Sequence, residues 1–237
     1  MVRQRAGAPT ATVSWVMATR ERPTQTRALT RPSQRSSWRS VASLLSRLGS
    51  NIRADSSRAA PWFAGGDNNY GKLGGGTTGA NTGTTSPVIV QGLTDAKAIV
   101  AGNEHTCALK GNSSVVCWGK NSEGQLGNES KMSANKPVPI KSSLKFTAIT
   151  AGGHHSCALT TANSVLCWGQ NLYYQLGDNS NINRTAPVSV AAVKTDSLTG
   201  IKAIFGGYRH TFAARSKTDG VIAWGDNSYD QLAASPT

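Results

Sequence analysis

The sequence predicts an all-β fold, a partial β-propeller of four-stranded blades with about three in-frame repeats, preceded by a disordered basic segment. The first observation is a recurring phrase of the type Trp-Gly-x-Asn-x-x-Gly-Gln-Leu-Gly. Its leading glycines, Gly66, Gly119, Gly169 and Gly225, lie 53, 50 and 56 residues apart. The second observation is that short β-rich runs lie between Gly, Asn, Pro and Ser residues, with no sustained helical period. A period near 50 residues with several strands in each unit is typical of propeller blades.

Each unit contains four predicted strands. The first begins at a Pro-Val pair, which recurs at residues 87, 137 and 187, and the second is an Ala-Ile run. The third follows an Ala-Gly-x-x-His turn, and the fourth reads Val-x-Cys-Trp before a Gly/Asn-rich loop. Because a blade buries its faces only against neighbouring blades, we expect the tryptophans to pack at blade junctions. The positions that define the repeat are His105, Trp118, Gly119, Gly127, His155, Trp168, Gly169, Gly177, His210, Trp224 and Gly225.

These paired motifs resemble the regulator of chromosome condensation repeat, including its bacterial α-tubulin-suppressor-like relatives. The resemblance extends from Gly66 to about Leu232. It implies a propeller of about seven blades, whereas this chain holds three full in-frame repeats and a stub. We therefore expect a fragment of a larger repeat protein, whose incomplete ring exposes strand edges and self-associates.

A domain boundary is predicted between residues 1–65 and the repeat region, residues 66–237. Residues 1–60 hold eleven Arg and no Lys against Glu21 and Asp55, a net charge of +9 out of +13 for the whole chain. This composition is typical of a disordered basic arm or of a mitochondrial-type targeting segment. The repeats themselves are only weakly basic, so they give no convincing reason to expect a nucleic-acid partner.

A third interpretation is that residues 4–65 are one more repeat, scrambled by a frameshift in the gene or its sequence record. Read across codon boundaries, junctions 53/54 and 63/64 permit Cys, ten apart as in the in-frame repeats. Junction 64/65 permits Trp immediately before the motif resumes at Gly66. Under this hypothesis the positive charge of residues 1–60 gives no information about a binding partner. Resequencing the source DNA tests the hypothesis.

The four cysteines form two pairs, Cys107 with Cys117 and Cys157 with Cys167, each ten residues apart. Across a hairpin with a five-residue turn, the members of a pair lie opposite each other, where Cα atoms about 4.5–5.5 Å apart suit a disulfide. The last repeat lacks both cysteines together, which is expected of a bonded pair. The alternative is that cysteine merely fills both core positions. Disulfides favour an extracytoplasmic or secreted location, although no signal-peptide core follows Met1.

The chemical motifs point away from catalysis. His105, His155 and His210 occupy equivalent positions and could bind a metal, but their separate blades favour a structural role in which each ties down its own turn. The sequence contains no phosphate-binding loop, nucleophile elbow or calcium loop. We therefore expect no enzyme activity, no cofactor and no metal.

The expected function is that of a noncatalytic protein-binding scaffold. Its loops at residues 128–136 and 178–186 would present variable side chains to an unidentified protein partner. The resemblance supports this expectation, because known relatives include a secreted bacterial inhibitor of β-lactamases. The alternative that the resemblance implies is guanine-nucleotide exchange on a small GTPase. No apolar run is long enough to span a membrane.

Overall fold

The computed structural model describes residues 62–78, 83–191, 198, 200–215 and 220–232. The expectations for residues 1–65, a disordered arm or a frameshifted repeat, lie outside these residues except at positions 62–65, where Phe63 begins strand β1 instead of a disordered segment. The described elements, in chain order, are β1 (Phe63–Gly66), η1 (Asn69–Gly71), β2 (Thr84–Ile89), β3 (Ala96–Ala101), β4 (His105–Lys110), β5 (Val115–Gly119), β6 (Ala134–Pro139), β7 (Phe146–Ala151), β8 (His155–Thr160), β9 (Val165–Gly169), β10 (Arg184–Ser189), β11 (Ile201–Gly206), β12 (His210–Arg215) and β13 (Val221–Gly225).

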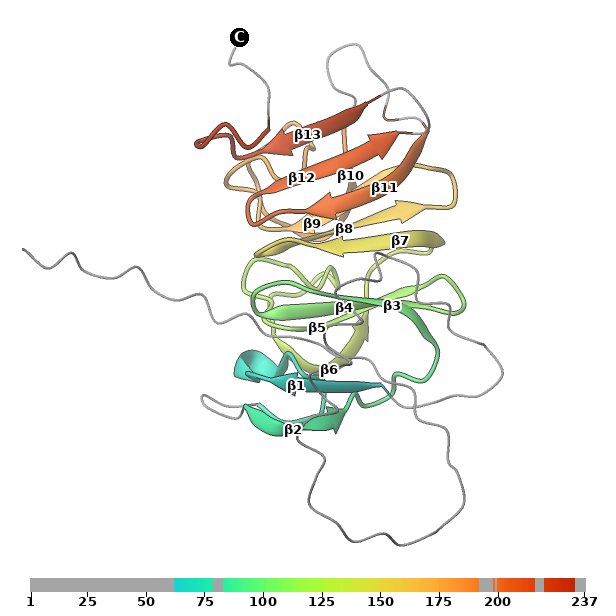
Figure 1. Cartoon of the computed structure of the whole chain (residues 1–237), viewed down its shortest axis with the longest axis vertical. Helices are drawn as coiled ribbons and strands as arrows, with labels where there is room; N and C mark the ends of the chain where they lie inside the picture. The colour runs from blue at the N-terminus through green and yellow to red at the C-terminus, as the bar shows by residue number, and fades with distance from the viewer. Residues whose placement is uncertain (1–61, 79–82, 192–197, 199, 216–219, 233–237) are drawn as a thin grey trace, which may run out of the picture.

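The strands form successive antiparallel sheets, which confirms the all-β prediction. Two sheets have four strands, in the orders β3-β4-β5-β6 and β10-β9-β8-β7, and the described residues also form a β1-β2 pair and a β11-β12-β13 sheet. The sheets follow one another along the longest axis of the molecule, from β1-β2 at one end to β13 at the other (Figure 1). Each sheet is one blade, and the order along the axis is the order in the chain.

The blades are out of phase with the sequence repeat. We predicted that the Pro-Val strand opens a unit, but it closes the preceding blade: β6 pairs with β5, with Cys117 opposite Val138. The physical reason is that the loop after β5 returns the chain antiparallel to β5, which makes a hairpin. The same register in the β1-β2 pair, with Ala64 opposite Val88, places Gly65 where the next blade has Trp118. The frameshift hypothesis is untested and stays a prediction.

The hydrophobic core lies between the blades rather than inside them. Strand β7 packs against β3 and β4 of the preceding blade, and β11 packs against β7 and β8. One core cluster joins Leu126, from the loop after β5, to Phe146 and Trp168 of the next blade. Trp118 and Trp168 are fully buried, so the tryptophans pack at the junctions as expected. Neighbouring blades therefore stabilise one another.

Candidate functional site

The repeat signature builds the blade junctions through one shared carbonyl group. The oxygen of Gln125 accepts hydrogen bonds from Trp168 Nε1 (2.9 Å) and Ser156 Oγ (3.1 Å), both on the next blade. His105 Nε2 lies 2.8 Å from the same Ser156 hydroxyl. Because the hydroxyl of Ser156 donates its hydrogen to Gln125 O, the hydroxyl oxygen accepts a hydrogen bond from the His105 Nε2–H. The junction is therefore a fixed chain of donors and acceptors that crosses from blade to blade.

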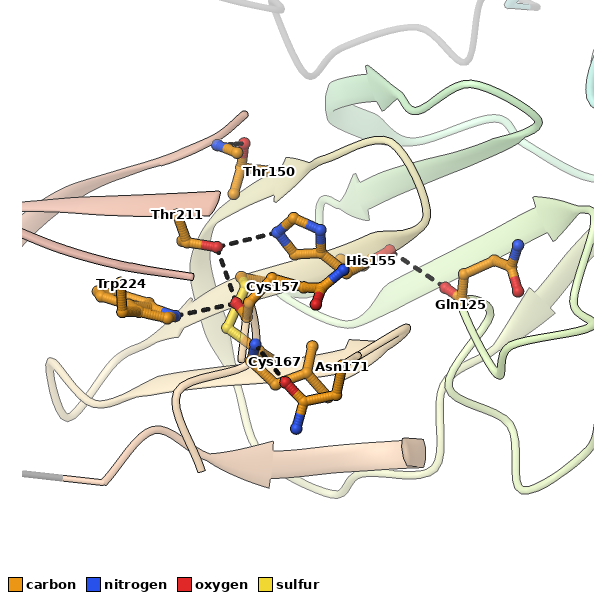
Figure 2. The surroundings of a disulfide bond; sticks show 12 residues. Gln125, Thr150, His155, Cys157, Cys167, Asn171, Thr211 and Trp224 are labelled. Atoms are coloured by element: carbon orange, nitrogen blue, oxygen red, sulfur yellow. Dashed lines mark hydrogen bonds between the residues drawn. A yellow bond between two sulfur atoms is a disulfide. The ribbon is translucent and has the colours of Figure 1, made fainter. Parts of the chain in front are cut away.

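The next junction repeats this arrangement with different side chains (Figure 2). Gln175 O accepts from Trp224 Nε1 (2.9 Å) and Thr211 Oγ1 (3.0 Å). His155 Nε2 lies 2.9 Å from the Thr211 hydroxyl. Ser156 and Thr211 occupy equivalent positions and make the same hydrogen bonds, because each presents a hydroxyl group to the histidine of the preceding blade.

The histidine rings therefore bond differently from our prediction. We expected each ring to tie down its own turn, but the backbone does this: the Gly102 N–H donates to His105 O at 2.9 Å. The ring reaches the next blade instead. Burial lowers the pKa of both His105 and His155 to about 3, so both are neutral at physiological pH. Within the described ranges no three His, Cys, Asp or Glu residues are grouped to hold a metal ion.

Both predicted cysteine pairs are at disulfide-bonding distance. Cys107–Cys117 has an S–S distance of 2.14 Å and Cys157–Cys167 one of 2.11 Å, with Cα separations of 4.0 and 4.1 Å. Each pair joins the two middle strands of its blade at directly opposite positions. At the matching register, β12 and β13 place Phe212 opposite Ala223. Both pairs are buried, and Cys157–Cys167 lies beside the junction bonds (Figure 2).

The loops after β5 and β9 are held by one asparagine each. Asn121 Nδ2 donates to Asn128 Oδ1, to Ser130 O and to Met132 O at 2.8–3.1 Å, while Asn121 Oδ1 accepts from the Leu126 N–H at 2.9 Å. Asn171 makes the corresponding bonds in the next blade. These bonds shape the two loops that the sequence singled out, residues 128–136 and 178–186. At matching positions in these loops, Met132 and Ile182 are largely exposed.

The residues directly after β5, β9 and β13 meet the turns that follow the first strand of each blade, and these turns are joined from blade to blade by the bonds Asn103 N–H to Gly153 O and Gly153 N–H to Tyr208 O, both 3.1 Å. The N–H groups of Lys120, Gln170 and Asp226 donate to the carbonyls of Glu104, His154 and Arg209 at 2.8–2.9 Å. We call this the rim surface, and it comprises residues 103–104, 120–123, 153–154, 170–174, 208–209 and 226–230. Its exposed large apolar side chains are Leu172, Tyr174, Tyr208 and Tyr229, and the exposed Tyr70 of the first phrase lies beside it, against Lys120.

Most of these rim side chains were missed by the sequence analysis. The available signal was an internal comparison: Ser122-Glu123-Gly124 in one repeat corresponds to Leu172-Tyr173-Tyr174 in the next. Positions that differ between repeats are free of the constraints that build the junction. Such positions carry individual function on a common frame.

Cations on and beside the rim surface contact tyrosine rings and carboxylates. The Arg209 guanidinium lies 4.1 Å from the centre of the Tyr173 ring and 5.5 Å from that of Tyr208. Lys120 lies 4.9 Å from the Tyr70 ring centre and 2.6 Å from the Glu104 carboxylate. The surface is therefore amphipathic, with aromatic faces beside fixed charges.

Comparison with known proteins agrees with this architecture. The family model for the regulator of chromosome condensation (RCC1) repeat matches residues 63–109, 113–159 and 163–214, more than half of the chain. A second RCC1 repeat model matches residues 96–125 and 146–175. The chain belongs to the RCC1 repeat family. The resemblance suggested by the sequence motifs is thereby confirmed.

Solved structures share the RCC1-like propeller fold at low identity. Prp20p from Saccharomyces cerevisiae, described with its binding to Gsp1p and histones, is 23% identical with a TM-score of 0.62, over 75% of this chain and 44% of that one. Yeast RCC1 (Prp20) bound to Kap60 is 24% identical with a TM-score of 0.58, over 70% and 40%. Human WBSCR16 is 18% identical with a TM-score of 0.61, over 69% and 42%. The RCC1-repeat chain thus spans less than half the length of these proteins.

The RCC1 repeats contain no helix that could cross a membrane, as judged over the described part of the chain.

Proposed function

We propose that this RCC1-repeat chain is a noncatalytic protein-binding scaffold that uses the rim surface as its binding face. The observation that carries the proposal is the segment Leu172-Tyr173-Tyr174. Leu172 and Tyr174 are each 59% exposed, on a loop that Asn171 holds in place. Tyrosine on a rigid loop supplies a large contact area at a low cost in conformational entropy, as in many protein-binding surfaces.

The backbone at Tyr174 strengthens this interpretation. Tyr174 has a φ of 61°, in the left-handed region, where the equivalent residues of the two preceding blades are Gly71 and Gly124. A non-glycine residue in this region costs about 1–2 kcal/mol. Tyr174 is 59% exposed among the described residues, which hold no strand at the place where β10 covers Gly124, so contacts within them do not offset this cost. Strain kept at an exposed aromatic residue is typical of a functional position.

The binding test compares a rim variant with a matched control. The rim variant combines Leu172→Ser with Tyr174→Gly, and the control combines Ile89→Ser with Leu144→Ser, which are exposed apolar residues elsewhere. Cross-linking in extracts of the source organism, read by mass spectrometry, should give the same partners for the parent and the control. The rim variant should lose these partners. Equal capture by both variants would show that the rim surface is not the binding face.

We also propose an extracytoplasmic location, which the two disulfide-distance pairs support. Protein isolated without reductant should gain the mass of four hydrogen atoms on denaturing reduction. Four free thiols before reduction would overturn the proposal.

The alternative is guanine-nucleotide exchange, which family membership and the described binding of Prp20p to Gsp1p favour. A nucleotide-release assay on a fluorescent-GDP-loaded small GTPase separates the two functions. The scaffold proposal expects the release rate to be unchanged by the chain. Accelerated release would replace the scaffold with an exchange factor.

A further inference from the structure

We propose that Arg209, held between Tyr173 and Tyr208, is a receiving site for a carboxylate group of an aspartate or glutamate side chain on a protein partner. This inference rests on the proposed scaffold function and specifies the chemistry of the partner. It also places the centre of the binding face at the junction of the last two described blades.

The position of Arg209 is built by two separate segments. Tyr173 comes from the loop after β9, and Tyr208 and Arg209 form the turn between β11 and β12. The guanidinium is 4.1 Å from one ring centre and 5.5 Å from the other. His154 lies edge-on to Tyr208, with ring centres 5.9 Å apart. Stacking on aromatic faces orients a guanidinium without using its N–H donors.

The other cations near this face already have carboxylate partners. Lys72 lies 2.6 Å from Asp67, and Arg184 lies 2.7 Å from Asp178, while Lys120 is paired with Glu104. Among the described residues, the Arg209 side chain has neither a carboxylate within 4.0 Å nor a hydrogen-bond acceptor. Arginine carries five N–H donors in a planar fork. These donors are therefore available to a ligand.

The neighbouring Asp226 does not occupy this fork. Its Oδ1 accepts hydrogen bonds from the Ser228 hydroxyl (2.5 Å) and the Ser228 N–H (2.9 Å). These bonds lower the pKa of Asp226, and the charge of Arg209 contributes further. Asp226 thus remains an ionised neighbour that attracts Arg209 from beyond ion-pair distance.

The surrounding charges select the kind of anion. Glu123, Asp226 and Asp230 lie on or beside the same rim surface, and together they repel polyanions such as nucleic acids. A single carboxylate among apolar groups avoids this repulsion, and Leu172, Tyr174 and Tyr229 provide the apolar contacts. A bidentate arginine–carboxylate pair is strong and geometrically specific. Arginine and tyrosine are also the residue types that most often dominate binding energy at protein interfaces.

The test is a selection of random twelve-residue peptides displayed on phage. The library is first depleted on immobilised Arg209→Gln chain and then selected on the parent chain. Both chains carry the same eleven arginines in residues 1–60, so their attraction for acidic peptides cancels. The enriched peptides should contain Asp or Glu beside apolar residues.

The affinities of synthetic copies of the enriched peptides then show how much the Arg209 side chain contributes to binding. We expect Arg209→Gln to weaken binding about tenfold or more and Arg209→Lys to restore part of the loss, because lysine keeps the charge and lacks the fork. Lys202→Gln, an exposed cation on β11, should leave the affinity unchanged. A peptide with its Glu changed to Gln should bind the parent chain about as weakly as the unchanged peptide binds Arg209→Gln. The comparison of the Glu and Gln peptides on the parent chain alone needs no variant protein.

Three results would overturn the carboxylate site: no enrichment after depletion, enriched peptides without acidic residues, or equal binding of Glu and Gln peptides. The rim variant described under Proposed function keeps Arg209. Loss of partners in that variant without any acidic preference in the peptides would therefore support the scaffold and reject the carboxylate site.

Discussion

Residues at the same position of the repeat differ sharply in what they tolerate. Gly124 has a φ of 87°, and a Cβ there would lie 2.6 Å from Arg184 O and 2.8 Å from Thr185 Cα of the next blade. Tyr174 occupies the corresponding place one blade later with its side chain mostly exposed. Glycine is thus required by the neighbouring blade at one position and replaced by tyrosine at the other.

This contrast predicts unequal effects of two alanine substitutions. Gly124→Ala should lower the free energy of unfolding by about 3 kcal/mol, because it combines left-handed strain with overpacking against backbone atoms. Tyr174→Ala should change it by less than about 1 kcal/mol, since only an exposed ring is lost. Urea unfolding followed by circular dichroism measures both. Equal losses would show that the cover of Gly124 by Arg184 and Thr185 makes no difference between the two positions.

The buried histidines predict a distinct dependence of stability on pH. His105 and His155 have folded pKa values of about 3, below the ordinary 6.5, so the unfolded chain binds more protons than the folded one. Their contribution is complete above about pH 6.5 and is lost as pH falls toward 3. Each histidine should remove about 1.4 kcal/mol per pH unit within this window.

The carboxylates act at lower pH and can be separated from the histidines. Hydrogen bonds and lysine or arginine partners lower the pKa values of Asp67 and Asp178 against the opposing effect of burial, so their contribution is lost only below their ordinary value of 3.8. Unfolding measured between pH 4 and 6.5 therefore isolates the histidines, among which His154, whose pKa burial also lowers, supplies the remaining part of the slope. The variant His105→Gln/His155→Gln should lose most of the slope in this range, and an unchanged slope would rule out the histidines as its source.

In each blade, the hairpin that carries the cysteine positions pairs strands that are close together in the sequence. Strands β4 and β5 pair Cys107 with Cys117, and β8 and β9 pair Cys157 with Cys167. Strands β12 and β13 form the same hairpin with Phe212 opposite Ala223. The hairpin geometry therefore does not require the disulfide, which instead adds stability.

Removing one disulfide bond should lower the free energy of unfolding without changing the fold. The variant Cys157→Ala/Cys167→Ala should lose about 2–3 kcal/mol, because a disulfide closing a loop with a sequence separation of 10 restricts the unfolded chain. Denaturant unfolding checks the magnitude, and circular dichroism should show unchanged strand content. A loss of strand signal in native buffer would mean that the bond is needed to form the hairpin.

The whole molecule is held together by junctions rather than by isolated blades. Each junction centres on one backbone carbonyl, such as Gln125 O, that accepts two side-chain donors from the next blade. Each blade is therefore stabilised mainly by its contacts with the adjacent blades. The outer edge of β13 has no strand partner among the described residues, and the expected self-association stays a prediction.

A junction variant should weaken the whole array. Trp168→Phe removes the indole N–H and part of the ring from a fully buried site, which should cost about 2 kcal/mol. Tyr229→Phe, on an 89% exposed side chain, is the control and should have almost no effect. Equal midpoints of thermal unfolding for the two variants would contradict the junction as the stabilising unit.

Much of this architecture could be read from residues close together in the chain. The strand pattern, the register of the middle hairpins and the cysteine pairing follow from segments about ten residues apart. Short hairpins have their register set by turn length, so a spacing of ten places Cys107 opposite Cys117. The family followed from motifs of the same short range.

The remaining features depend on contacts between blades. The bond from His105 to Ser156 joins positions 51 residues apart, and Arg209 stacks on Tyr173 from a different blade. The closing role of the Pro-Val strand likewise depended on the path of the preceding loop. No local pattern encodes which side chains meet across a junction, because that depends on how complete sheets stack. The repeated motifs alone determined the strands and hairpins, whereas the proposed binding face depends on how the blades pack against one another.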